Sequence, residues 1–282
     1  EELPAGALLP EGPAARTPWH LAGCLESPST GCETLVVRVP ELALLMLAHH
    51  AADEHLLAAA AEAAASPGGS QACEFVARTA ARMLRRPADE VEPAAVERMR
   101  QLWSGLLGGW VEPRAEPPAG PAEAQAEPPA VRLLSAFPGV AAALLQHGRA
   151  DVLRSASGRK LPTESLRSAR VHERASAAAA ALGRVCEASA RDVLTAVLHR
   201  IAPRLAAVTA AGTVSSTADG GEPVSCARLL LQAPSELRFS VPAGAANTSG
   251  AGLLPEVQAT LDRVAGEWGL KVALRGEVYV GS

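Results

Sequence analysis

The stretch Val111-Glu-Pro-Arg-Ala-Glu-Pro-Pro-Ala-Gly-Pro-Ala-Glu-Ala-Gln-Ala-Glu-Pro-Pro-Ala130 divides this chain into two parts. It holds six prolines in twenty residues. Proline removes a backbone donor and interrupts both helices and central strands. Such a composition is typical of a semi-extended linker. We therefore predict a linker at 111–130, between an N-terminal helical region at 1–110 and a second helical region at 131–211.

The region before the linker has the apolar spacing of three helices. Apolar residues recur at steps of three and four from Pro40 to Leu56, which indicates the first helix. A break at 66–69 precedes the second, and the third places Trp103 and Leu106 on one stripe. Helices joined by short breaks are typical of stacked antiparallel hairpins. We expect a mainly α fold of helical hairpins, repeat-like in architecture, although the sequence has no fixed repeat period.

The part after the linker changes character at Gly212. A helix at 131–150 and a long helical stretch at 171–209, kinked or ended by Pro203, come first. Beyond them, 212–282 reads as a small C-terminal α+β unit of the ββαββ type. Its predicted elements are strands at 229–231 and 237–241, a helix at 254–268, and a hairpin of strands at 270–274 and 278–280.

The composition of this chain weakens arginine as a sign of phosphate binding. The 282 residues include only two lysines against 24 arginines, a bias that G+C-rich codons produce. Arginine is therefore no evidence by itself of phosphate recognition. The net charge of −4 favours neither a nucleic-acid nor a membrane partner. The sequence has no run of 18 apolar residues, so we predict no transmembrane segment.

Motifs for catalysis, metal binding and cofactor binding are weak. The cluster from His49 to His55 offers at most two ligands on one helix face, whereas a metal site needs three or four. The loop Gly244–Gly252 lacks the Lys-Ser/Thr ending of a P-loop. The sequence also lacks the Gly-x-Ser-x-Gly motif that carries the nucleophile of many serine hydrolases. We predict no catalytic, metal or cofactor site, and the chain is not expected to be an enzyme.

Two features of the N-terminal part concern compartment. Cys24 and Cys32 flank a loop that a disulfide could close, and buried thiols are the alternative. The chain begins at Glu1 rather than Met, which is compatible with removal of an organellar targeting segment. A sequence that starts late is the alternative, so the compartment stays open, with an organelle such as the mitochondrion favoured.

A basic segment at 147–174 is the densest charge signal. Cations and hydroxyls are interleaved along it, as in segments that contact a nucleic-acid backbone. A solvated basic loop is the alternative interpretation. The candidate RNA or phosphate contacts are Arg149, Arg154, Arg159, Lys160, Arg167, Arg170 and Arg174, with Arg78, Arg82 and Arg85 on an earlier helix as an extension.

Two hypotheses of function follow from these observations. The first is a non-catalytic structural subunit of a larger multi-protein assembly, organellar in location, whose partners are other protein subunits. The second is an RNA-binding accessory or ribosome-associated protein that uses the basic segment, so that the assembly is a ribonucleoprotein. An enzyme would need a pocket in which a third polar residue joins His49 and Asp53.

Overall fold

The computed structural model describes residues 32–66, 71–108, 129–163, 171–212, 227–242 and 245–281. The strands are β1 (Cys32–Arg38), β2 (Leu153–Arg154), β3 (Lys160–Leu161), β4 (Arg228–Gln232), β5 (Glu236–Pro242) and β6 (Glu277–Gly281). The helices are α2 (Leu42–Ala51), α3 (Glu54–Ala65), α4 (Gln71–Leu84), α5 (Pro93–Leu107), α6 (Pro129–Ala136), α7 (Pro138–Gly148), α8 (Val171–Gly212) and α9 (Ala245–Glu267), with a 3-10 turn, η2, at Ala88–Glu90.

An antiparallel sheet joins the two ends of the described chain. Its strand order is β4-β5-β1-β6, so the first strand lies between two strands from the C-terminal part. In this register Arg38 lies opposite Glu236 on one side and Glu277 on the other. A second, two-stranded sheet pairs β2 with β3.

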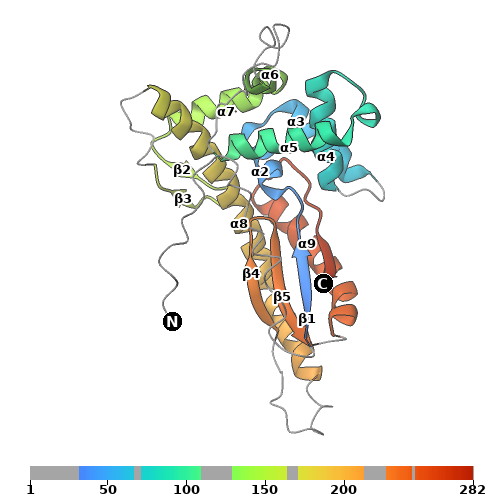
Figure 1. The fold of residues 1–282 in the computed structure, drawn as a ribbon. Helices are drawn as coiled ribbons and strands as arrows, with labels where there is room; N and C mark the ends of the chain where they lie inside the picture. Colours follow the sequence, from blue (N-terminus) through green and yellow to red (C-terminus); the bar gives the residue numbers. More distant parts are fainter. Residues whose placement is uncertain are drawn as a thin grey trace, which may run out of the picture.

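The expected fold of helical hairpins with a separate C-terminal unit is wrong, because β1 belongs to the same sheet as β4, β5 and β6. The predicted hairpin at 270–274 and 278–280 is also wrong, since only β6 is a strand there and it pairs with β1. Figure 1 shows α2 to α7 gathered at one end of the sheet, with α8 running from that group behind the strands.

The main core lies between the sheet and the two long helices behind it. Leu35 and Val37 of β1 and Phe239 of β5 belong to one buried cluster with Val257 of α9 and Val197 of α8. Alternate residues of a strand point to the same face, which is why residues two apart in β1 share this core. The buried apolar area supplies most of the stability of such a layer.

Helix α8 is longer than the sequence indicated. Its apolar face includes Leu182, Val193 and Ile201, all buried as the periodicity predicted. Pro203 lies inside the helix, which continues to Gly212. The prediction left open whether Pro203 kinks or ends the helix, and the helix does not end there.

The first predicted helix is broken in two at Asp53. Ala52 has a left-handed backbone with φ 48°, and Asp53 then caps α3 by accepting from the N–H groups of His55 and Leu56 at 3.0 and 3.1 Å. Its other carboxylate oxygen accepts from the N–H of Gly139 in α7 at 2.7 Å. The buried carboxylate of Asp53 therefore caps the first turns of both α3 and α7.

The division of the chain at the linker stays a prediction. Residues 109–128 lie outside the described part, and the last two residues of the predicted linker begin α6. Cys24 also lies outside it, so the predicted choice between a disulfide and thiols stays open. Cys186 of α8 is buried, and burial raises the pKa of its thiol well above the usual value.

Candidate nucleic-acid interface

A pocket of about 200 Å³ lies where the strands meet α5. We call it the strand-end pocket. The end of β1, the turn between β4 and β5, the start of α2 and one side of α5 line it. Its polar and turn-forming lining residues are Arg38, Glu41, Arg100, Ser104, Pro234 and Ser235.

Backbone pairing places Arg38 at this pocket. Arg38 is the last residue of β1, and its side chain is exposed. The N–H of Val39 donates to the carbonyl of Ser235 at 2.8 Å, which fixes the β4–β5 turn beside the end of β1. A cation and a serine from distant parts of the sequence are thus brought together by the central position of β1.

Glu41 has a strained backbone at the rim of the pocket. Its φ of 51° is left-handed, which non-glycine residues adopt at a cost. Its side chain makes no cap for α2 and instead accepts from the Nε of Arg100 at 3.0 Å. Strain of this kind is often retained at functional sites, because the surrounding structure enforces it.

Arg100 is held between two carboxylates. It donates to Glu41 and, through a second nitrogen, to Glu97 at 2.6 Å. Burial alone would lower the pKa of Arg100, but the hydrogen bonds from both glutamates reverse this effect and raise its pKa above the usual value. The guanidinium therefore stays charged at the pocket.

Helix α8 passes alongside this pocket. Gly183 packs against the backbone of Leu107, at the end of α5. Further along, Thr195 accepts from the side-chain amide of Gln232 in β4 at 3.1 Å. Leu107 lines the pocket and Gln232 precedes its Pro234 turn, so α8 contacts two elements that border the pocket.

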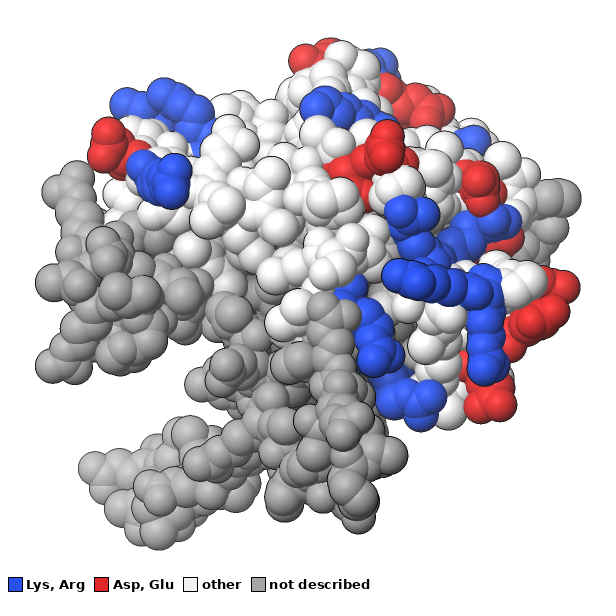
Figure 2. Space-filling view, turned by 90° about the horizontal axis from the view of Figure 1, so that it is seen from above, with Lys and Arg blue, Asp and Glu red and all other residues white. Residues whose placement is uncertain are grey.

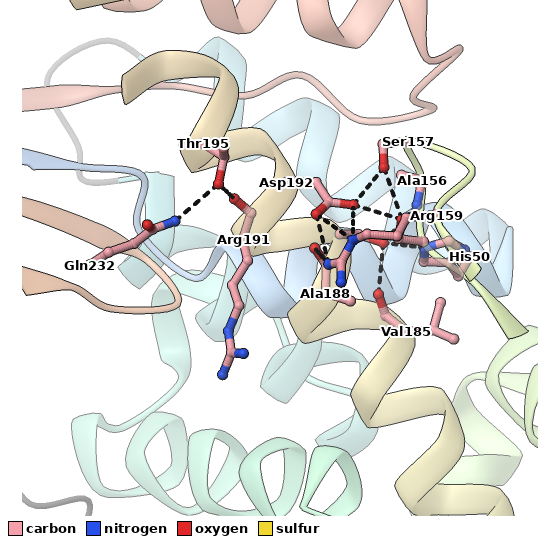
Figure 3. Close-up of polar contacts among 12 residues, drawn as sticks. His50, Ala156, Ser157, Arg159, Val185, Ala188, Arg191, Asp192, Thr195 and Gln232 are labelled. Carbon is pink, nitrogen blue, oxygen red and sulfur yellow. Dashed lines mark hydrogen bonds and ion pairs between the residues drawn. The ribbon is translucent and has the colours of Figure 1, made fainter. Parts of the chain in front are cut away.

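The exposed face of this part of α8 carries two arginines. Arg184, Glu187 and Arg191 are exposed and recur at three- and four-residue steps; we call them the α8 stripe. Within the described residues neither arginine has an ion pair. In Figure 3 the guanidinium of Arg191 extends away from the polar network around Asp192. Sequence reasoning missed these residues, although their spacing on a predicted helix was a usable signal.

The residue after Arg191, Asp192, holds the β2–β3 hairpin. Its carboxylate accepts from Ser155 at 2.7 Å, from Ser157 at 2.5 Å and from Nε and a terminal nitrogen of Arg159 at 3.0 and 2.7 Å (Figure 3). Burial is the largest single influence and raises the pKa of Asp192, but the hydrogen bonds from Arg159, Ser155 and Ser157 together outweigh it. The pKa consequently lies below the usual value for aspartate.

Ser189 connects the same hairpin to α2. Its hydroxyl donates to the carbonyl of Val185 at 2.7 Å and accepts from the N–H of Ala156 at 2.9 Å. Since a serine hydroxyl has one hydrogen, the Nε2 of His50 at 2.9 Å must be the donor in their contact. Burial, with further contributions from nearby His and Lys charges, lowers the pKa of His50 to about 3, so the ring is neutral.

The hairpin contact gives a pH-dependent prediction. Asp192→Asn is expected to destabilise the protein at neutral pH by about 1 kcal/mol, because hydrogen bonds to a charged group are lost and solvent screens part of the effect. A carboxyl whose folded pKa is lowered stabilises the fold above its unfolded pKa, near 4, and loses this effect as pH falls through the folded pKa. The difference in unfolding free energy between wild type and variant should therefore shrink below about pH 4. A difference that is constant from pH 7 to pH 3 in urea titrations would contradict this assignment.

The predicted basic segment is only partly available as a surface. Arg149, Arg154 and Lys160 are exposed, whereas Arg159 is committed to Asp192. Arg154 also donates to the carbonyl of Gly158 at 3.0 Å. Of the remaining candidates, Arg167 and Arg170 lie outside the described residues, and of Arg174 only the helical backbone is described.

The earlier helix does not extend this segment as a free basic face. Arg78 pairs with Glu62 and with Glu74, the latter at 2.8 Å. Arg82 donates to the carbonyl of Ala136 at 3.1 Å, and Arg85 is exposed with a left-handed φ of 55°. Figure 2 shows basic and acidic side chains mixed on the side of α3 to α5, a smaller mixed group on the opposite side, and a broad area of neither charge between them.

The histidine cluster does not converge on one point. His49 accepts from the N–H of Lys271 at 3.2 Å, His50 donates to Ser189, and Asp53 caps α3 and α7. Within the part of the chain that the structure describes, no group of three or more His, Cys, Asp or Glu side chains could hold a metal ion. No described helix is long and apolar enough to cross a membrane by itself, although α6 and α7, bent by 101° at their junction, pass that test of length and composition as a pair.

Comparison with known proteins identifies the fold. No protein-family model and no curated protein matches the chain. Among solved structures, the chain is similar to the POL domain of Pol1 from M. smegmatis, determined in complex with DNA primer-template and dNTP, with a TM-score of 0.62 and 21% sequence identity. The match covers 90% of this chain and 40% of the other. The chain therefore spans less than half of the polymerase domain whose fold it shares.

This similarity corrects the functional expectations from the sequence. The fold is one that a nucleic-acid enzyme uses, so the expected non-catalytic structural subunit is wrong. RNA binding through the basic segment at 147–174 stays a prediction, since a nucleic-acid partner is compatible with this fold. The same similarity counts against the expectation that the chain is not an enzyme. The scaffold, multi-subunit, mitochondrial and ribonucleoprotein associations have no support from the fold.

The residues that line the strand-end pocket do not suit a pair of divalent metal ions. Polymerases act through two divalent ions, which hard oxygen ligands such as carboxylates hold. The carboxylate that lines the strand-end pocket, Glu41, is bonded to Arg100, and Arg38 adds another positive charge. The described residues thus supply guanidinium groups at this pocket where a metal pair would need carboxylates.

Proposed function

We propose that this chain binds DNA in the form of a primer–template duplex. The observation that carries the proposal is the similarity in fold, over 90% of the chain, to a polymerase domain solved with DNA primer-template and dNTP.

Two neighbouring features support a contact surface for DNA. The strand-end pocket presents the exposed Arg38, and the α8 stripe presents Arg184 and Arg191 beside it. Arginine is the side chain best suited to bind phosphate, because its planar fork donates two parallel hydrogen bonds. The net charge of the whole chain is negative, so binding depends on where these few cations lie.

The β2–β3 hairpin extends the proposed surface along α8. Arg154 and Lys160 are exposed on it, and Asp192 fixes the hairpin to the helix that carries the stripe. In this proposal they contact the DNA backbone without reading its sequence. Since the comparison structure also holds a dNTP, nucleotide addition is the activity to assay beside binding.

The test compares variants in a fluorescence anisotropy titration of a labelled primer–template duplex. Replacing both Arg184 and Arg191 with alanine should weaken binding about ten-fold and lower the slope of log K against log salt by about two, one for each lost phosphate contact. The matched control is Arg263→Ala, an exposed arginine on α9, which should bind like the wild type. Equal losses in the double variant and the control would contradict the assigned surface.

A further inference from the structure

The strand-end pocket presents the exposed guanidinium of Arg38, for which no ion pair is found within the described residues, beside the Arg100 guanidinium that pairs with Glu41 and Glu97. A divalent ion seeks several oxygen ligands that are free to coordinate it. Around this pocket the carboxylates already have guanidinium partners: Glu41 accepts from Arg100 at 3.0 Å, and Glu236 accepts from Arg238 at 2.9 Å. A metal ion would have to displace these pairs.

Arg38 makes the pocket still less suitable for a cation. It stands at the end of the central strand β1, in register with Glu236 and Glu277, and its side chain is exposed at the pocket rim. A divalent ion in the pocket would lie near Arg38 and Arg100, and charges of the same sign repel at such short range. A phosphate at the same place would be attracted by Arg38, whereas the charge of Arg100 is already balanced by Glu41 and Glu97.

Hydroxyl groups complete the donor set for an anion. Ser104 of α5 and Ser235 of the β4–β5 turn line the same pocket as the two arginines. The turn is fixed, because the N–H of Ala233 donates to the carbonyl of Glu236 at 2.9 Å and Val39 donates to Ser235. A volume of about 200 Å³ is enough to admit a phosphate group.

We infer that the strand-end pocket binds a phosphate group directly, through Arg38 together with Ser104 and Ser235, without a divalent cation. The inference rests on the proposed function, since the phosphate is one of the DNA backbone or of a nucleoside triphosphate. In this proposal the guanidinium of Arg38 neutralises the charge of the phosphate.

The experiment measures the dissociation constant of a labelled primer–template duplex in excess EDTA and again in Mg²⁺, at the same ionic strength. The wild type should bind equally well, within about two-fold, in both buffers. Arg38→Ala should weaken binding about ten-fold in both, whereas Arg38→Lys, which keeps the charge, should recover part of the loss. Arg263→Ala again serves as the control for removal of one exposed arginine.

A second arm identifies the source of the phosphate. Addition of a dNTP without DNA, in EDTA, should raise the melting temperature of the wild type but not of Arg38→Ala if the pocket takes a nucleotide. If only DNA binding responds to Arg38, the phosphate is one of the backbone. Either result supports the inference.

Three results separate failure of this inference from failure of the proposed function. Binding that appears only with Mg²⁺, or Mg²⁺-dependent extension of the primer by the purified chain, would overturn the anion site and leave DNA binding intact. Wild-type binding that is unchanged in Arg38→Ala would also overturn the role of this pocket alone. Absence of saturable binding in both buffers would overturn the proposed function and, with it, the inference.

Discussion

Replacing Gly183 with alanine is expected to destabilise the protein by about 3 kcal/mol or more, the upper part of the range for overpacking. A Cβ atom at this position would lie 1.7 Å from the carbonyl oxygen of Leu107. That oxygen belongs to the backbone at the end of α5, so no side-chain rotation can relieve the clash. The two helices would have to separate, and α5 lines the pocket that we assign to DNA binding.

Gly266→Ala provides the matched control for this change. Gly266 lies in α9, and a Cβ there would meet nothing within 4 Å. Alanine is favoured over glycine in helices, so this variant should be as stable as the wild type or more stable, by up to about 1 kcal/mol. Urea unfolding curves of both variants check the pair. A Gly183→Ala protein as stable as Gly266→Ala would show that α5 and α8 are not in contact there.

Asp53→Ala is expected to lower the free energy of unfolding by about 3 kcal/mol, because the substitution removes two stabilising contributions at once. Loss of the cap on α3 costs about 1 kcal/mol. The N–H of Gly139, which donates to the same carboxylate at 2.7 Å, would be left without its partner, at a further cost of about 1–3 kcal/mol. Asp53 is only 2% exposed, so solvent replaces these contacts poorly.

Asp53→Asn should fall between the wild type and Asp53→Ala in the same measurement. The single amide oxygen of the asparagine side chain can accept from the N–H groups of α3 or from the N–H of Gly139, but not from both. Its NH₂ group is a donor and cannot accept the remaining hydrogen bond. Asp89→Ala, at an exposed position in η2, controls for removal of one negative charge. Equal stability of Asp53→Ala and Asp89→Ala would contradict the double cap.

Helical periodicity was sufficient to predict several parts of this fold. The stripe of Trp103 and Leu106 marks α5, and the wide apolar face around Val193 marks α8. These signals are local, because residues on one face of a helix are three or four positions apart. For the same reason the break at Asp53 was missed: the capping contact to Gly139 joins positions 86 residues apart.

The central position of β1 could not be predicted from its sequence. Its seven residues pair with strands about two hundred positions later or more. Pairing of this kind leaves no local pattern beyond a short apolar run. The strand-end pocket depends on that pairing, since Arg38, Arg100 and Ser235 come from three separate parts of the chain. The basic segment, in contrast, was visible in the sequence, but its Arg159 is engaged by Asp192, 33 positions later in α8.

Photo-crosslinking of a primer–template duplex that carries a reactive group beside the primer end, followed by mass spectrometry of the attached peptides, tests the central claim most directly. The account predicts crosslinks to peptides that contain the α8 stripe at 184–191, the β4–β5 turn or the end of β1. Crosslinks confined to α3 or α9, or none at DNA concentrations that saturate binding, would contradict the assignment of this surface to DNA.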